Sequence, residues 1–284
     1  MDKNQDIPWS LVVTPKSNWL NLNLREIWRY KDLVFLFLKR DIVTVYKQTI
    51  LGPLWFIIQP VLTTLVFTVI FGNIANISTD GLPHVLFYLS GIVVWNYFAD
   101  CIKNTADAFK ANENIFGKVY FPRVIVPLST VLSNLVKFGI QFLLFIGVLI
   151  FYTFKIDLPA IGLDIIILPF LIVLVALLSL GCGMIISSLT TKYRDLSFLI
   201  SFGIQLLMYA TPVIYPLSEA PEEYRPFILA NPMSSLIESF RNIFLGTGEI
   251  SFSHLLYSLI FTVVIFLAGL IVFNKTEKTF MDTV

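Results

Sequence analysis

The stretch YKQTILGPLWFIIQP, residues 46–60, marks the point where the chain changes character. Its first residues are polar, whereas its second half is almost wholly apolar and yet contains Pro53, Trp55 and Pro60. Proline is tolerated in the first turn of a helix, and tryptophan concentrates where a membrane meets water. The stretch therefore predicts a junction between a segment on the membrane surface and an upright membrane span that begins at Leu54.

The composition places the whole chain in the membrane class. Hydrophobic residues make up 56% of the 284 positions, charged residues only 14%, and the mean hydropathy is +0.79. A soluble domain of this size needs more charge to cover its surface. The formal net charge of +1 provides no basic footprint, so we expect no nucleic-acid partner.

Apolar stretches of sufficient length predict the membrane spans, because a bilayer core about 30 Å thick needs about 20 residues per helix. The six stretches are Leu54–Ile74, Val85–Ile102, Ile125–Phe154, Leu163–Leu189, Leu196–Ile214 and Leu255–Phe273. We therefore predict an all-α integral membrane protein with six transmembrane helices. Its three regions are a tail with a surface helix, a transmembrane domain and a second tail, at residues 1–53, 54–274 and 275–284.

Lysine and arginine gather on one side of the predicted spans. They are frequent before the first span, between spans two and three, and between spans four and five. The opposite side has only Lys155, Arg225 and Arg241. Because positively charged loops remain in the cytoplasm, both termini are expected there.

Residues 22–49 form the first of two segments that are too polar to span the membrane. Apolar and charged side chains alternate along it, with a break near Lys31. This pattern predicts an amphipathic helix that lies along the inner membrane surface.

Residues 215–250 form the second such segment, on the outer side between spans five and six. It contains NPMSSLIESFRNIFLGTG, which predicts a short helix with Ser234 or Ser235 as N-cap candidates and Gly246 as its C-terminal stop. We expect this segment to re-enter the outer leaflet and to be held against protein.

The sequence contains no motif for chemistry of its own. Gly117 and Lys118 lack the rest of a phosphate-binding P-loop, and His84 and His254 are isolated. The predicted spans hold few carboxylates, chiefly Asp100. We therefore expect no catalytic site, no metal site and no cofactor bound by this chain.

Several stretches in register carry a family resemblance, and they are YKQTILGPLWFIIQP (46–60), GKVYFPRVIVPLS (117–129), KYRDLSFLISFGIQLLMYATPVIYP (192–216) and NPMSSLIESFRNIFLG (231–246). Together they resemble the ABC-2 type permeases over nearly the whole chain. More specifically, they look like the membrane subunits of bacterial polysaccharide exporters for O-antigen, capsule or wall teichoic acid.

The resemblance implies a transport subunit that is not an enzyme. Such permeases form homodimers and work with two copies of a separate nucleotide-binding subunit, which holds the ATP and Mg²⁺. They lie in the bacterial inner membrane and move polysaccharide, often linked to undecaprenyl diphosphate, between its leaflets. For this chain, O-antigen is the favoured substrate.

The loop between spans two and three is the candidate contact with the nucleotide-binding subunit. Residues 107–123, DAFKANENIFGKVYFPR, alternate charged and aromatic side chains, which predicts a short amphipathic helix. The resemblance indicates a docking role for this helix. We expect its contacts to come from Glu113, Asn114, Phe116 and Lys118.

The second span carries aromatic and polar side chains together, a mixture that a lipid-facing helix would not show. A polysaccharide favours aromatic faces that stack on sugar rings. We therefore expect Tyr88, Trp95, Tyr97 and Phe98 to line its path.

Lys137 is a basic residue well inside the third span, with Asn134 and Gln141 on the same helix face. A lysine exposed to lipid at mid-depth costs about 2.5–3.5 kcal/mol on insertion scales. The polar stripe is therefore expected to face the pathway or Asp100 on span two, with Asp100 as the favoured charge partner. The alternative is a lysine that snorkels from a tilted helix.

Arg40 and Lys47 are the candidates for contact with the lipid diphosphate, because basic groups and anionic headgroups meet at the inner surface. Two other functions remain open from the sequence. One is an ABC-2 permease for a small lipid or drug. The other is a self-contained secondary carrier, which would need an internal repeat or broken midplane helices, and no repeat is visible.

Overall fold

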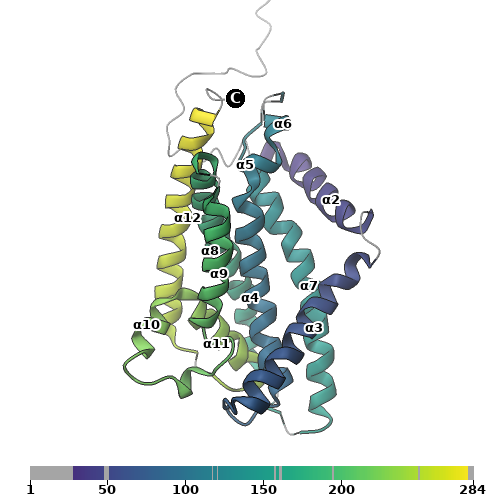
Figure 1. The fold of residues 1–284 in the computed structure, drawn as a ribbon, viewed down its shortest axis with the longest axis vertical. Coiled ribbons are helices and arrows are strands. Elements are labelled where there is room, and N and C mark those ends of the chain that lie inside the picture. Colours follow the sequence, from purple (N-terminus) through teal and green to yellow (C-terminus); the bar gives the residue numbers. More distant parts are fainter. Residues whose placement is uncertain are drawn as a thin grey trace, which may run out of the picture.

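The computed structural model describes residues 28–47, 51–116, 118–119, 121–156, 158–159, 162–193, 195–248 and 250–280. This part of the chain is helical and contains no strand, which confirms the predicted all-α fold there (Figure 1). The longer helices are α2 (Lys31–Lys47), α3 (Trp55–Phe67), α4 (His84–Ala106), α7 (Ile125–Thr153), α8 (Leu168–Lys192), α9 (Leu196–Tyr209), α11 (Pro232–Leu245) and α12 (Phe252–Phe280). The short ones are η1 (Gly52–Leu54), η2 (Thr68–Ile74), α5 (Ala108–Ala111), α6 (Glu113–Phe116), η3 (Leu163–Ile167), η4 (Leu217–Glu219) and α10 (Arg225–Ala230).

Among the described residues, five helical segments are long and apolar enough to cross a membrane, namely Gly52–Ile74, His84–Ala106, Ile125–Thr153, Leu163–Lys192 and Phe252–Glu277. They coincide with five of the predicted stretches to within a few residues. The remaining stretch forms α9, which is apolar but only 14 residues long. It ends at Tyr209 because Pro212 disfavours the helical conformation at the residue before it.

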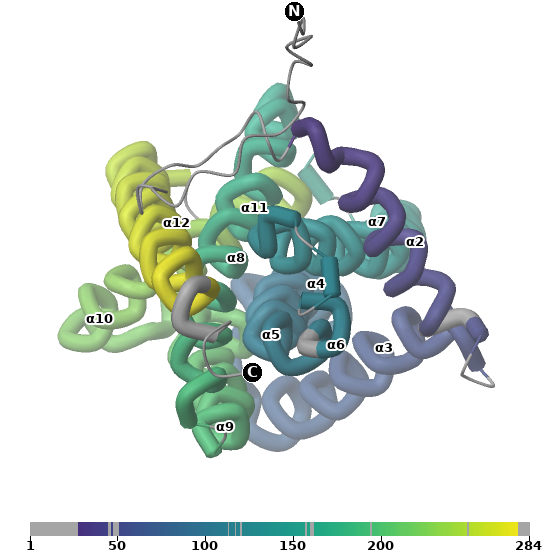
Figure 2. Tube along the Cα trace, turned by 90° about the horizontal axis from the view of Figure 1, so that it is seen from above, coloured from purple at the N-terminus to yellow at the C-terminus, as the bar shows by residue number. Residues whose placement is uncertain are grey.

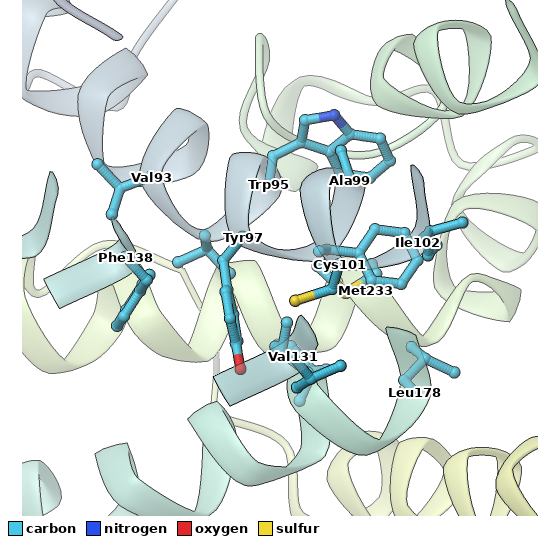
Figure 3. Packing of buried hydrophobic residues seen from close by; sticks show 14 of the residues in the cluster. Val93, Trp95, Tyr97, Ala99, Cys101, Ile102, Val131, Phe138, Leu178 and Met233 are labelled. Atoms are coloured by element: carbon cyan, nitrogen blue, oxygen red, sulfur yellow. The ribbon is translucent and has the colours of Figure 1, made fainter. Parts of the chain in front are cut away.

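Helix α4 forms the centre of the bundle, with α3, α7, α8 and α11 packed around it (Figure 2). In its hydrophobic stretch 83% of the residues are buried within the chain, compared with 17% in the first span. Figure 3 shows Trp95, Tyr97 and Cys101 of α4 among Phe138 of α7 and Met233 of α11. The second predicted span is therefore a core helix, whereas the first lies at the periphery.

The opening stretch of the first span folds as a short 3₁₀ turn followed by a helix. Pro53 lies in that first turn, where its missing N–H costs nothing, and Trp55 begins α3 with 48% of its surface exposed. Pro60 lies inside α3 and is buried. Beyond Phe67 the helix widens into the π-helical turn η2, which no feature of the sequence predicted.

Helix α2 forms the described part of the expected surface helix. Residues 28 and 29 are helical, Tyr30 lies in a turn and α2 then begins at Lys31, so the chain does break near that residue. Val34 and Phe37 of α2 are buried in the hydrophobic core, whereas Phe35 and Leu36 are exposed. Residues 22–27 and 48–50 of the predicted segment lie outside the described residues.

The segment between α9 and α12 contains the buried helix α11. The expected N-caps Ser234 and Ser235 are wrong, because the side chain of Asn231 accepts a hydrogen bond from the N–H of Met233 at 3.1 Å. Pro232 follows this cap, so the helix begins before either serine. Every residue of α11 except Asn242 is buried.

Gly246 ends α11, as predicted. Its φ angle is 67° and its N–H donates to the carbonyl of Asn242 at 3.1 Å. This left-handed conformation favours glycine.

Helices α8 and α12 cross at a point where both backbones approach closely. A Cβ added to Gly181 would lie 2.8 Å from the Cα of Phe266, and Gly269 faces the backbone of Gly181 in the same crossing. Small residues allow helices to pack this closely within a membrane. This contact fixes the last span against the core.

Gly269→Ala is expected to destabilise the purified protein by about 1–3 kcal/mol, because the added methyl group has no space at the α8–α12 crossing. The measurement is the thermal unfolding midpoint in detergent. Gly147→Ala on α7 is the matched control, since a Cβ there meets no atom within 4 Å. Equal midpoints for the two variants would show that α8 and α12 can move apart to accept the methyl group without loss of stability.

Candidate functional site

Four phenylalanines gather at the end of the bundle where α5 and α6 lie. The ring centroids of Phe109 and Phe116 are 5.9 Å apart, and Phe116 lies 5.9 Å from Phe121. Phe109 stacks on Phe273 of α12 at 4.6 Å. These four residues, termed the phenylalanine cluster below, fasten the short helices α5 and α6 to the last span.

The cluster changes the role expected for Phe116. Its side chain is only 2% exposed, so it offers no surface to another subunit. It instead supports the loop by packing against the rings of Phe109 and Phe121. The burial follows from its ring contacts, which sequence spacing does not reveal. Asn114 and Lys118 are exposed on the same loop, and the side chain of Glu113 lies outside the described residues.

Arg123 ties this loop to the end of α12. Its guanidinium carbon lies 5.0 Å from the centroid of the Phe116 ring, and its Nη1 donates to the carbonyl of Glu277 at 3.2 Å. The Glu277 carboxylate lies 3.7 Å from Nε. Burial lowers the pKa of Arg123 from its ordinary value, and the Glu277 carboxylate opposes that shift.

Arg40 links α2 to the same loop. Its Nη1 donates to Oδ1 of Asn112 at 3.0 Å, and Nδ2 of Asn112 donates to the carbonyl of Ala108. The guanidinium carbon also lies 4.7 Å from the Phe37 ring, which packs on Phe121 of the phenylalanine cluster at 5.8 Å. Helix α2 and the loop therefore share one continuous set of contacts.

These contacts bear on the expected lipid-diphosphate site. Arg40 pairs with Asp41 at 2.8 Å and bonds to Asn112, which occupies part of its donor capacity, although 40% of its side chain stays exposed. Lys47 is exposed near the end of α2. The two residues lie seven positions apart, on the same side of the helix.

The four aromatic residues expected to line the pathway are buried in the core, each at most 3% exposed, and they are Tyr88, Trp95, Tyr97 and Phe98. The void beside Tyr97 measures only about 10 Å³, which is about the space of one water and far too small for a sugar ring. Within the described residues, the hydroxyls of Tyr88 and Tyr97 have no hydrogen-bond partner.

The expected pairing of Lys137 with Asp100 is confirmed. Lys137 Nζ lies 2.5 Å from Asp100 Oδ2, and the two side chains are 19% and 24% exposed. One turn earlier on α7, Asn134 accepts a hydrogen bond from Asn104 of α4 at 3.1 Å. Lys137 also lies 5.2 Å from the Phe56 ring, so this polar stripe is held where α3, α4 and α7 meet.

The sequence reading missed a buried ion pair on α11. Arg241, at 1% exposed, pairs with Glu238 at 3.2 Å and donates to the carbonyls of Pro212 and Val213. Its guanidinium also stacks 3.7 Å from the Phe87 ring of α4. The available signal was a glutamate and an arginine three positions apart, the spacing at which helical side chains meet, within an otherwise apolar helix.

Gly91 of α4 makes room for this arginine. A Cβ at this position would lie 2.8 Å from Nη2 of Arg241 and 3.2 Å from the carbonyl oxygen of Val213. The glycine, the arginine and the turn after α9 therefore form one interlocking contact.

Comparison with known protein families identifies the family of this chain. The family model described as ABC-2 type transporter matches residues 32–245, from α2 to the end of α11. This chain belongs to the ABC-2 type transporter family. Membership favours an ATP-driven transporter over the self-contained carrier considered from the sequence, and it makes the chain a multi-pass membrane protein.

Three curated relatives of this ABC-2 protein are named as export or transport proteins for O-antigen or polysialic acid. An O-antigen export system permease protein RfbA of Klebsiella pneumoniae is 30% identical over 254 residues, which cover 88% of this chain and 94% of the relative. RfbA of Myxococcus xanthus is 28% identical, covering 78% of this chain and 83% of the relative. The polysialic acid transport protein KpsM of Escherichia coli is 24% identical, covering 86% and 93%.

Asp100→Asn is expected to destabilise this ABC-2 protein by about 1–3 kcal/mol, because it leaves the Lys137 charge without a partner inside a span. The double variant Asp100→Leu with Lys137→Leu should lose less, since both charges are removed together. Thermal unfolding in detergent measures both effects.

Asp195→Asn is the matched control, because Asp195 is exposed at the start of α9. A double variant that is less stable than Asp100→Asn would show that an unpaired Lys137 charge is not the cause of the lost stability.

Proposed function

We propose that this chain is the permease subunit of an ATP-driven exporter that moves lipid-linked polysaccharide across the bacterial inner membrane. The observation that carries this proposal is the similarity to O-antigen export permeases along nearly the full length of both chains. It favours O-antigen as the polysaccharide and undecaprenyl diphosphate as its lipid carrier. The chain would act as a homodimer with two nucleotide-binding subunits.

The end of the bundle with α5 and α6 is proposed to be the cytoplasmic docking face. The positive-inside rule supports this placement, because Lys103, Lys110, Lys118 and Arg123 gather on and beside this loop. A partner that pushes on exposed Asn114 and Lys118 would displace α5 and α6. The phenylalanine cluster and its two arginines would pass that displacement to α2 and α12.

The second copy of the chain is proposed to contact α3 and α9. These helices expose large apolar side chains, among them Leu62 and Val66 of α3 and Phe198 and Phe202 of α9. Lipid alone could cover these residues. However, α9 buries only Ile204 within this chain, so a helix of this length gains most of its packing from another surface.

In the assembled exporter, α9 and the turn that follows it are proposed to supply the sixth span. Helix α11 is proposed to re-enter the outer leaflet. Its nearly complete burial and its capped ends support this, because backbone at membrane depth must be satisfied by protein. Both termini would then lie in the cytoplasm.

Tyr88, Trp95, Tyr97, Phe98 and Lys137 remain proposed pathway residues, and they would act only after the bundle rearranges. The unpartnered hydroxyls of Tyr88 and Tyr97 support this role, since a buried hydroxyl without a partner is costly and a sugar could supply one. At the inner surface, the lipid diphosphate would meet the basic groups of α2.

Arg40 and Lys47 are those basic groups. Arg40 would have to share its guanidinium between the diphosphate and Asn112. Substrate arrival would thereby act on the same loop that contacts the nucleotide-binding subunit.

Lys118→Glu is expected to reduce co-purification of a co-expressed nucleotide-binding subunit several-fold, because it reverses an exposed charge on the docking face. Polysaccharide export by intact cells should fall in parallel. Lys155→Glu is the matched control, since Lys155 is an exposed lysine at the opposite end of α7. A normal complex and normal export in Lys118→Glu would place the docking face elsewhere.

Tyr97→Phe is expected to stabilise the protein by about 1 kcal/mol, because it removes a buried hydroxyl that has no partner in this state. Export should nevertheless fall, since the hydroxyl would meet sugar during transport. Thermal unfolding and surface polysaccharide are measured together, with exposed Tyr224→Phe as control. Increased stability with full export would identify Tyr97 as a packing residue.

A further inference from the structure

An open groove of about 580 Å³ lies between α10 and the first turns of α12. These helix segments lie at the end of the bundle away from α5 and α6 (Figure 1). Its size falls in the range of about 300–1,000 Å³ that is typical of small-molecule sites. Its polar lining residues are Glu222, Arg225, His254 and Tyr257. Its aliphatic lining residues are Pro226, Leu229 and Ala230. The groove thus presents one carboxylate beside one guanidinium and one imidazole.

Two of these side chains are fixed in place. Arg225 donates from Nε to the carbonyl of Ala220 at 3.0 Å and from Nη2 to the carbonyl of Ser218 at 2.8 Å. The hydroxyl of Tyr257 donates to the carbonyl of Ala230 at 2.8 Å, which holds its ring at the groove wall. Fixed side chains lose little freedom on binding, which favours a ligand.

The charges in the groove are available to a ligand. Neither Glu222 nor Arg225 forms an ion pair with another residue that the structure describes. Because Arg225 uses its hydrogen bonds on neutral carbonyls, its positive charge is not cancelled. A matching ligand therefore carries a negative and a positive group close together.

Exposed aromatic side chains indicate the level at which the groove lies in the membrane. Tyr224, Phe227 and Phe252 around it are 59%, 77% and 81% exposed. Tyrosine concentrates where a membrane meets water, and Phe252 is the first residue of a membrane-crossing segment. The groove therefore lies at the level of the phospholipid headgroups.

We propose that the groove binds the headgroup of a zwitterionic phospholipid of the ethanolamine type. Its phosphate lies against Arg225 and His254, its ammonium group pairs with Glu222, and its glycerol and first methylenes cover Leu229. An anionic headgroup would meet the Glu222 carboxylate unfavourably. A neutral sugar would leave both charges unmatched. The proposal depends on the membrane depth of the groove and not on which polysaccharide the protein exports.

Lipid retention by the full-length chain tests this proposal. The purified protein in mild detergent is incubated with phosphatidylethanolamine, phosphatidylglycerol or phosphatidylcholine, and bound lipid is counted by native mass spectrometry. Phosphatidylethanolamine should be retained roughly 1.5- to fivefold more than phosphatidylglycerol, the ratio expected of one exposed ion pair. Phosphatidylcholine should be retained less, because its methylated ammonium donates no hydrogen bond.

Variants identify the groove as the place of binding. Glu222→Gln should remove the preference for phosphatidylethanolamine, whereas Glu223→Gln, an exposed neighbour outside the groove lining, should leave it intact. Arg225 also holds two carbonyls, so His254→Leu is the second variant, and it should lower retention of all three lipids.

Equal retention of the three lipids, or identical behaviour of Glu222→Gln and Glu223→Gln, would overturn the proposal. Displacement of bound lipid by maltoheptaose would replace the lipid with a glycan as occupant. The measurement requires neither ATP nor a nucleotide-binding subunit. A failure of polysaccharide export would therefore leave its outcome unchanged, and the two proposals fail separately.

Discussion

A single buried cation holds the part of the fold opposite α5 and α6 together. The guanidinium of Arg241 joins three segments that are far apart in the sequence: α11, the turn after α9 and the centre of α4. A charge in this place is tolerated because Glu238, two carbonyls and an aromatic ring surround it, and because Gly91 leaves space for it. Without these partners, the buried charge of Arg241 would strongly destabilise this part of the fold.

The other end of the bundle is organised differently, by aromatic packing rather than by one ion pair. The phenylalanine cluster brings α5, α6, the segment before α7 and the end of α12 into contact. Arg40 and Arg123 tie these segments to α2 and to Glu277. The two ends are therefore held by different means, packed rings at one end and a buried ion pair at the other.

The sequence predicted well whatever depends on local composition. The bilayer thickness determines the length of a span, so five of the spans followed from hydropathy, and helical spacing identified the stripe that pairs Lys137 with Asp100. It failed where tertiary contacts decide. The sequence predicted Phe116 as a contact with another subunit and Arg241 as a charge on the outer side. In the structure both side chains are buried, and Arg241 packs against α4. The short length of α9 follows from a proline whose effect the sequence only suggested.

The π-helical turn η2 at the far end of α3 has a consequence for how this chain tolerates length changes. A π turn accommodates one residue more than the α-helix around it, through bonds to the fifth residue rather than the fourth. Deleting one residue between positions 68 and 74 would let the turn relax to regular α geometry while α3 kept its own register. Because the extra residue is taken up within the turn, the loop that follows would keep its direction, whereas the same deletion in a regular α-helix would rotate it by roughly 100° about the helix axis. A one-residue deletion is therefore tolerated at this turn, whereas elsewhere in a span it would turn every later side chain towards a different neighbour.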